Sequence, residues 1–295
     1  MITEGLITKA LSGYYYVTAE DGTVVTCRAR GKFRMDGTSP LVGDRVRVAI
    51  SADGSGSVRE ILPRRNWFVR PNVANIDILV ILASAVNPIT DPSLIDRMTT
   101  LAENHDCEAL ICINKADLDR GDALYDIYER AGFRVLRTSA VSGEGVRELS
   151  ELLRGHTAAF SGNSGVGKSS LLNAMQPELR LRCGEVSERL GRGRHTTRHI
   201  ELFALEGGGY LADTPGFGSF DAEQMESVRA PELQYCFREF APYLGNCRFA
   251  DCTHRREPGC AVTEAVESGA IPLSRHASYL ALYEQAAKLR DWEIK

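Results

Sequence analysis

Short hydrophobic and polar runs alternate over residues 1–66 without a helical period. Alternation with a period of two is typical of half-buried strands, and turn-forming residues separate the runs. Five strands in about sixty residues predict a small OB-type β-barrel. The expected strands are residues 5–10, 14–18, 24–30, 44–50 and 57–61.

From Trp67 onward, strand patterns alternate with helix patterns, which predicts one α/β domain with a parallel sheet covered on both faces. The expected strands are residues 76–82, 108–113, 134–137, 157–160, 200–204 and 210–212, and the expected helices are residues 92–104, 122–131, 146–153 and 168–175. After Phe220 the pattern becomes mainly helical and ends in an amphipathic helix over residues 275–292. We therefore divide this multidomain chain into residues 1–66, 67–220 and 221–295.

The composition is that of an ordinary globular protein, with 43% hydrophobic and 25% charged residues in 295 residues. The longest apolar run, residues 76–86, is shorter than the ~18 residues of a membrane span and contains Asp77 and Ser84, so it predicts a buried strand. The N-terminus has no basic patch followed by an apolar stretch. We therefore expect a cytoplasmic protein without a membrane partner.

The net charge of −4 conceals an asymmetry. Residues 1–66 contain ten Lys and Arg against seven Asp and Glu, a net charge of +3, so a polyanion is expected to bind at this end. Aromatic and basic side chains here could stack on RNA bases and contact phosphates. They are Tyr14, Tyr15, Tyr16, Arg28, Arg30, Lys32, Phe33 and Arg34. Alternatively, these aromatic residues are divided between core and surface and bind no RNA.

A phosphate-binding loop follows the strand expected at residues 157–160. Its residues match the pattern G-x-x-x-x-G-K-[ST] and are Gly162, Asn163, Ser164, Gly165, Val166, Gly167, Lys168 and Ser169, with Ser170 counted in the same site. Backbone N–H groups and the N-terminus of the following helix converge on phosphates in such a loop. Lys168 is expected to reach the β- and γ-phosphates and act in catalysis, and the Ser169 hydroxyl to bind Mg²⁺.

A second phosphate-side motif, D-T-P-G, begins at Asp213 directly after an expected strand. Ligands of open α/β sheets bind at this edge. Asp213 is expected to hold Mg²⁺ through water, and the N–H of Gly216 to contact a γ-phosphate. Alone, D-T-P-G is a common turn, but downstream of a phosphate loop it favours a nucleotide site.

Residues 114–117 have the N-K-x-D pattern that reads guanine in GTPases. The Asp117 carboxylate can accept hydrogen bonds from the ring N–H and the exocyclic amine of guanine, a pair that adenine does not present. Asn114 and Lys115 would brace the loop and cover the base. Ser139 and Ala140, after the next strand, match the S-A element that supports the base from the other side.

The order of the two motifs is unusual, because the guanine motif precedes the phosphate loop, whereas ordinary GTPases have the reverse order. The first half of the domain supplies about three strands and the base site but no phosphate site. The second half supplies about three strands and the phosphate site but no base site. Neither half alone therefore completes a sheet or a pocket. Circular permutation is the simplest explanation. The segment after Gly216 then runs directly into the C-terminal module, so nucleotide state could move that module.

Residues 189–198, between the phosphate loop and Asp213, are basic and glycine-rich and are expected to form a mobile switch loop. One Thr must contact Mg²⁺ and the γ-phosphate; we favour Thr197, with Thr196 as the alternative. Ras-type enzymes place a water-orienting Gln where this chain has Phe217, so slow intrinsic hydrolysis is expected. His195 is the candidate for aligning the water, and a merely solvated basic loop is the alternative.

A metal cluster is predicted from Cys247, Cys252, His254 and Cys260, because their spacing gathers three thiolates and one imidazole within fourteen residues. These ligands close the tetrahedral shell of Zn²⁺ and leave no position for chemistry, so one structural zinc is expected. Cys236 is an alternative ligand, and ordinary free thiols are the alternative interpretation. The remaining cysteines, Cys27, Cys107, Cys112 and Cys183, are scattered.

These motifs, in this order, resemble those of the circularly permuted bacterial GTPases called ribosome small-subunit-dependent GTPase A. The resemblance covers nearly the whole chain: L-V-G-D-R-V at 41–46, N-K-A-D, the phosphate loop, R-H-T-T-R at 194–198, D-T-P-G-F and the Cys/His tail. It implies a late assembly factor of the small ribosomal subunit that binds 16S rRNA, hydrolyses GTP when docked and is released on hydrolysis. The implied cofactors are GTP or GDP, Mg²⁺ and one Zn²⁺. Nothing in the sequence requires an oligomer, so a monomer is expected.

Two other functions stay open at this point. The nucleotide could gate an RNA- or protein-binding module that is not tied to the ribosome, or the chain could be an ATPase. The residues alone indicate only a GTPase with an RNA-binding barrel.

Overall fold

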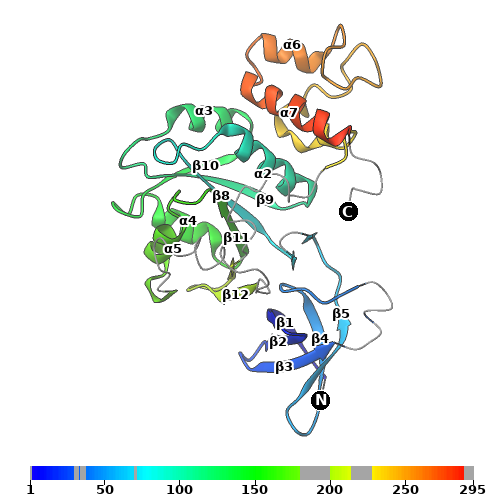
Figure 1. Ribbon diagram of the computed structural model, residues 1–295, viewed down its shortest axis with the longest axis vertical. Coiled ribbons are helices and arrows are strands. Elements are labelled where there is room, and N and C mark those ends of the chain that lie inside the picture. The colour runs from blue at the N-terminus through cyan, green and yellow to red at the C-terminus, as the bar shows by residue number, and fades with distance from the viewer. Residues whose placement is uncertain are drawn as a thin grey trace.

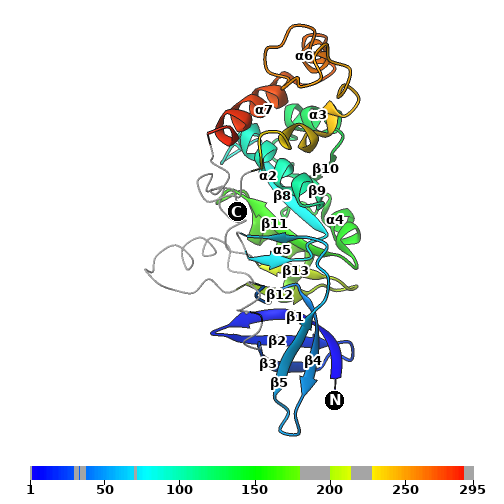
Figure 2. The same cartoon turned by 90° about the vertical axis from the view of Figure 1, so that its right-hand side faces the viewer.

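The computed structural model describes residues 2–29, 33, 38–69, 72–179, 200–213 and 228–288. Figure 1 shows an N-terminal barrel, a central α/β region and a C-terminal region of helices and loops. In the view turned by 90°, the three regions follow one another along the long axis, with the barrel at one end (Figure 2). Within the described ranges, no helix has both the length and the apolar character needed to cross a membrane.

The barrel has five strands in the order β1-β2-β3-β5-β4, and it closes because β4 also pairs with β1. The strands are β1 (Ile2–Leu11), β2 (Tyr14–Ala19), β3 (Val24–Ala29), β4 (Arg45–Ile50) and β5 (Gly56–Ile61), which confirms the five expected strands. Alternate residues point inward, so Val46 and Val48 are buried while Arg45 and Arg47 are exposed. Gly56 is required at the closure, since a side chain there would collide with the Cys27 sulfur.

The central sheet contains five parallel strands in the order β10-β9-β8-β11-β13. They are β8 (Ile78–Ser84), β9 (Glu108–Asn114), β10 (Arg134–Thr138), β11 (Thr157–Gly162) and β13 (Tyr210–Asp213). β12 (Glu201–Ala204) is antiparallel to β13, so the expectation of a wholly parallel sheet is wrong at this strand. The turn between the two strands is short and is closed by Leu205 N donating to Gly209 O at 3.0 Å. A parallel pair would need a long crossover, so a short turn can join only antiparallel strands.

Helices cover both faces of the central sheet. On one face, α2 (Pro92–Asn104) and α3 (Asp122–Arg130) share a core with Leu79 and Ile81 of β8. On the other, α4 (Val146–Leu153) and α5 (Lys168–Met175) pack with Ile78 and Val80. Successive residues of β8 therefore serve opposite cores, which explains its continuous apolar run.

The barrel and the central sheet are joined along one edge. Lys9 of β1 pairs with Glu201 of β12, so the strands of both regions form one eleven-stranded sheet. In the linker, the Arg64 guanidinium donates to the buried Asp44 carboxylate at 2.7 Å. A two-stranded hairpin of β6 (Trp67–Phe68) and β7 (Val73–Ala74) follows, which sequence analysis did not predict.

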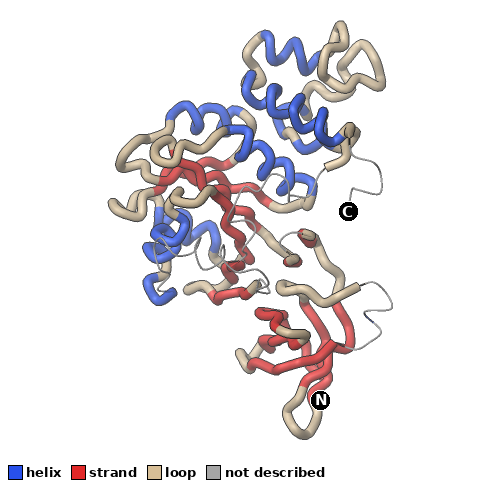
Figure 3. The backbone as a smooth tube through the Cα atoms, viewed as in Figure 1, coloured by secondary structure: helices blue, strands red, loops and turns tan. Residues whose placement is uncertain are grey.

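The C-terminal region, residues 228–288, consists of helices and loops (Figure 3). Its helical elements are η2 (Leu233–Cys236), η3 (Arg238–Phe240), α6 (Ala261–Glu267) and α7 (Leu273–Ala286), while η1 (Pro177–Leu179) follows α5. The last expected helix is α7, which begins two residues earlier than predicted and ends at Ala286, before the predicted end at residue 292. Fully buried Arg275 of α7 bonds Asp96 of α2 at 2.7 Å and Glu239 of η3 at 2.6 Å, which fixes this region against α2.

Candidate nucleotide-binding site and metal cluster

The two predicted halves of the nucleotide site lie at the same edge of the central sheet. Asn114, the last residue of β9, is in register with Ser84 of β8 and Thr138 of β10. β11 ends at Gly162, which is in register with Leu82 of β8. Since neighbouring strands are about 4.8 Å apart, the ends of β9 and β11, separated by β8, are about 10 Å apart. This edge is where open α/β sheets bind their ligands.

Asn114 connects the guanine motif directly to the phosphate loop. Its Nδ2 donates to the carbonyl oxygen of Val166 at 2.9 Å, and its Oδ1 accepts from the Thr138 hydroxyl at 3.1 Å. Gly167 has a φ of 102°, and the Asn114 amide occupies the place where a side chain at Gly167 would lie. The two loops therefore form one packed unit. Sequence analysis did not assign Thr138, which is fully buried.

Ser139 orients the carboxylate of Asp117. The Ser139 hydroxyl accepts from the backbone N–H groups of Val141 and Ser142 at 3.2 and 3.1 Å, and it donates to Asp117 Oδ1. Because its lone pairs face two donors, the hydroxyl proton is directed to the carboxylate. Ala140 lies in the same turn, which is closed by Ser139 N donating to Glu144 O. An exposed, oriented carboxylate suits recognition of paired N–H donors.

Lys115 lies between the guanine motif and the loop after β8. Its backbone has a φ of 62°, in the sparsely populated left-handed region, and its Nζ donates to the Asn87 carbonyl. The neighbouring Pro88 lies against Gly165 of the phosphate loop. Asn87 and Pro88 thus contact both halves of the site, a role with no recognisable signal in the sequence.

The phosphate loop leads directly into α5. Gly167 is the N-cap of this helix and supplies no side-chain acceptor, and Lys168, Ser169 and Ser170 form the first turn. The first N–H groups of a helix have no intrahelical partner, so they are available to an anion. Gly165 has a φ of 81°, and both Ser164 and Gly165 are exposed, so the backbone of the loop is accessible. Val166, which is fully buried, anchors the loop in the core.

Asp213 is the last residue of β13, next to β11, so its backbone lies at the same edge. Its side chain is outside the described part of the structure, as are Thr196, Thr197, His195, Gly216 and Phe217. The assignments made for these residues stay predictions.

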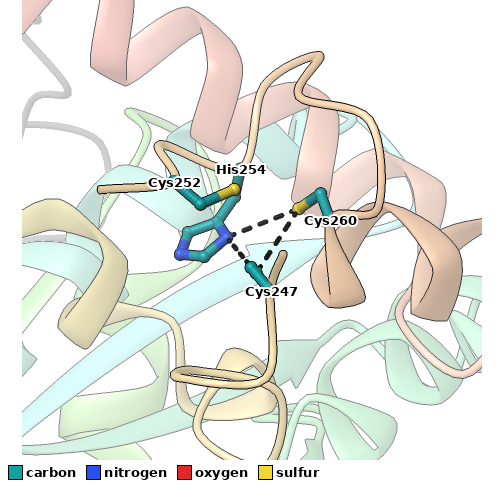
Figure 4. Close-up of side chains that lie close together, drawn as sticks. All are labelled: Cys247, Cys252, His254 and Cys260. Carbon is teal, nitrogen blue, oxygen red and sulfur yellow. Dashed lines mark hydrogen bonds between the residues drawn. The ribbon is translucent and has the colours of Figure 1, made fainter. Parts of the chain in front are cut away.

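In the C-terminal region, the four predicted metal ligands come together, as Figure 4 shows. Their ligand atoms lie within 4.8 Å of one another. Nδ1 of His254 is 3.5 Å from the sulfur atoms of both Cys247 and Cys260, which are 4.0 Å apart. Tetrahedral Zn²⁺ with bonds of ~2.3 Å to sulfur and ~2.0 Å to nitrogen would separate its ligands by about 3.5–3.8 Å. The cluster, including Cys252, therefore fits one structural zinc.

Several buried thiols lie outside the cluster. Burial raises the pKa of Cys27 to about 11 and the pKa of Cys107 and Cys236 to about 12, so these thiols stay protonated at neutral pH. The same cause raises the pKa of metal-free Cys252, inside the cluster, to about 12. Cys236, the alternative ligand, lies outside the cluster with its thiol toward Glu232 O. Burial lowers the pKa of His254, which favours the neutral imidazole that binds metals.

Sequence models of two protein families match the chain, the RsgA N-terminal domain over residues 4–58 and the RsgA GTPase over residues 61–223. A Moorella thermoacetica protein named small ribosomal subunit biogenesis GTPase RsgA is 46% identical over 292 residues, covering 98% of this chain and 99% of that protein. The protein of the same name from Caldanaerobacter subterraneus is 45% identical over 285 residues, 96% of this chain and 95% of its own length.

Two solved structures are similar over almost the entire chain. YjeQ from Thermotoga maritima superposes with a TM-score of 0.82 at 34% identity, covering 98% of this chain and 100% of that one. YloQ, described as a circularly permuted GTPase, superposes with a TM-score of 0.79 at 36% identity, covering 98% and 97%. The strand order, with the guanine motif on β9 preceding the phosphate loop after β11, agrees with that description.

Proposed function

The chain belongs to the RsgA GTPase family, and we propose that it hydrolyses GTP to GDP and phosphate as an assembly factor of the small ribosomal subunit. The observation that supports this most strongly is the hydrogen bond from Asn114 to the Val166 carbonyl, because it joins the base-reading and phosphate-binding segments in one site. The proposed domains are residues 1–66, 67–220 and 221–295. The proposed location is the cytoplasm, where bacterial ribosomes assemble.

At the base end, we assign guanine recognition to the Asp117 carboxylate, oriented by Ser139. Asn114 braces this loop against the phosphate loop. Lys115 and Ala140 would flank the base. The hydrogen-bond donors of guanine match a carboxylate, whereas the adenine edge would leave that carboxylate without partners, and this asymmetry gives the discrimination.

At the phosphate end, N–H groups of the loop and of α5 bind the phosphates, and Lys168 balances negative charge that develops during transfer. Ser169, Asp213 and Thr197 would hold Mg²⁺, which when bound neutralises phosphate charge. The N–H of Gly216 would contact the γ-phosphate. Phe217 cannot orient water, so turnover by the isolated chain is expected to be slow, with His195 as the candidate for that role.

We assign binding of 16S rRNA to the barrel. Its exposed face carries Arg28 stacked over Tyr14 at 4.7 Å, an arrangement that suits base stacking and phosphate contact. Fewer side chains are available to contact RNA than the sequence predicted. Phe33 is 7% exposed and belongs to the core, and Tyr15 packs against that core. Arg30, Lys32 and Arg34 lie outside the described residues.

The test is GTP turnover by the purified chain alone, with isolated small ribosomal subunits, and with large subunits as the control. We expect slow turnover that small subunits, and not large subunits, increase in proportion to their concentration. Lys168→Ala should abolish the stimulated rate without preventing association through the barrel. Turnover that no ratio of small subunits increases would favour the alternative, a GTP-gated RNA- or protein-binding module not tied to the ribosome.

A further inference from the structure

Gln234 of η2 contacts the metal cluster from outside it. Its Oε1 lies 2.9 Å from Nε2 of His254, the ring nitrogen on the side away from the cluster. The orientation of the Gln234 amide is set by a second contact, because its Nε2 donates to the Pro231 carbonyl at 3.0 Å. A carbonyl cannot donate, so the amide nitrogen must face Pro231 and the amide oxygen must face His254.

This contact determines the histidine tautomer. Since the Gln234 oxygen only accepts, His254 Nε2 must carry the proton. A neutral imidazole has one N–H, so Nδ1 then has its lone pair available. Nδ1 is the atom that points toward the sulfur atoms of Cys247 and Cys260, at 3.5 Å from each (Figure 4).

The backbone around His254 is fixed separately, by α7. His276 Nε2 lies 2.8 Å from the His254 carbonyl, and the Tyr279 hydroxyl donates to the Thr253 carbonyl at 2.8 Å. These contacts hold a residue whose φ of 60° is rare for histidine. Thus α7 places the His254 backbone, while Gln234 determines the direction of the ring and its proton.

We propose that Gln234 is a positioning residue of the zinc cluster, which it serves by holding His254 in the Nε2-protonated tautomer without touching the metal. Such outer-shell partners typically change metal affinity by about 10–100-fold when removed. The proposal is independent of GTP hydrolysis and rests only on the assignment of zinc to the four ligands.

The test compares zinc affinity of the full chain and three variants, by competition with a chromophoric chelator. Gln234→Leu removes the acceptor, and Gln234→Glu keeps an acceptor at the same place. Gln285→Leu is the matched control, because Gln285 lies in α7 and accepts from Arg97 instead of the cluster. We expect Gln234→Leu to bind zinc about 10–100-fold more weakly than the unmodified chain. The zinc affinity of Gln285→Leu should be close to that of the unmodified chain, and the zinc affinity of Gln234→Glu should be close to it or higher.

Cobalt substitution supplies a readout of ligand geometry. The visible spectrum of the Co²⁺ form should keep its tetrahedral thiolate character in Gln234→Glu and lose intensity in Gln234→Leu. If Gln234→Leu and the unmodified chain bind zinc with equal affinity, the role of Gln234 is overturned. The same holds if zinc binding weakens equally in all three variants, or equally in Gln234→Leu and Gln234→Glu. An unmodified chain that binds no zinc would overturn the metal assignment itself, while the GTPase proposal would stand.

Discussion

A few buried polar side chains hold the nucleotide site together. Thr138 and Val166 lie on different strands or loops, and Asn114 bonds both of them. The N-K-A-D and phosphate-loop motifs could be read from the sequence because each is continuous. Thr138 and Asn87 could not, because their roles arise only when strands far apart in the chain become neighbours.

Replacing Thr138 by valine should weaken nucleotide binding while preserving the fold. Valine has nearly the shape of threonine, but it leaves the buried Asn114 Oδ1 without its donor, at a cost of about 1–2 kcal/mol, or roughly 5- to 30-fold in GDP affinity. Titration of a fluorescent GDP analogue measures this. The control is Thr100→Val in α2, also buried and bonded to a backbone carbonyl away from the site. Unchanged affinity in Thr138→Val would show that Asn114 needs no support.

Removing zinc should expose two of the cluster thiols, Cys247 and Cys260, to alkylation. Cys27, Cys107 and Cys236 have pKa values raised by burial to about 11–12, so at pH 7.5 they contain little reactive thiolate whether or not metal is bound. Cys247 and Cys260 should be protected with zinc and modified after chelation, as peptide mass spectrometry can show. Burial raises the pKa of metal-free Cys252 to about 12, so Cys252 should react slowly with or without metal. Equal modification of Cys247 and Cys260 with and without chelator would contradict the cluster.

At the scale of elements, helices with a clear period and the parallel pairing of five central strands were predictable, but the direction of β12 was not. The bounds of α2, α4 and α5 agree with the expected residues 92–104, 146–153 and 168–175. α6 was not assigned because its seven residues are too short for a pattern, and its N-cap is Cys260 of the Cys/His cluster. The pattern of β12 indicates a strand without revealing that a hairpin reverses it.

Replacing Arg275 should separate α7 from α2. The guanidinium is fully buried, and its pKa is raised: burial lowers it, but the carboxylates of Glu239 and Asp96 outweigh burial. Arg275→Leu leaves both carboxylates buried without their partner, which should lower the free energy of unfolding by about 3–5 kcal/mol. Urea unfolding measures this.

A compensated variant distinguishes the ion pairs from packing. Arg275→Leu combined with Asp96→Asn and Glu239→Gln removes the uncompensated charges and should recover part of the loss. If the triple variant is no more stable than Arg275→Leu, packing by the arginine side chain, and not charge, holds α7 in place.

At the scale of the whole molecule, two modules are attached to different sides of one nucleotide domain. The barrel joins the β12 edge, next to β13 and its terminal Asp213, whereas the C-terminal region joins α2 on the face over β8 and β9. Sequence analysis predicted that nucleotide state moves the C-terminal module; that stays a prediction, and the attachment to α2 gives the module an additional anchor.

The central claim is that one guanine nucleotide is bound jointly by the two halves of this permuted domain. The most direct measurement is a titration of GTP, ATP and xanthosine triphosphate into the unmodified chain and into Asp117→Asn. We predict that the unmodified chain prefers GTP, that ATP does not compete, and that Asp117→Asn loses at least about tenfold in GTP affinity while gaining xanthosine triphosphate. Equal competition by ATP, or an unaltered preference for GTP in Asp117→Asn, would contradict the account.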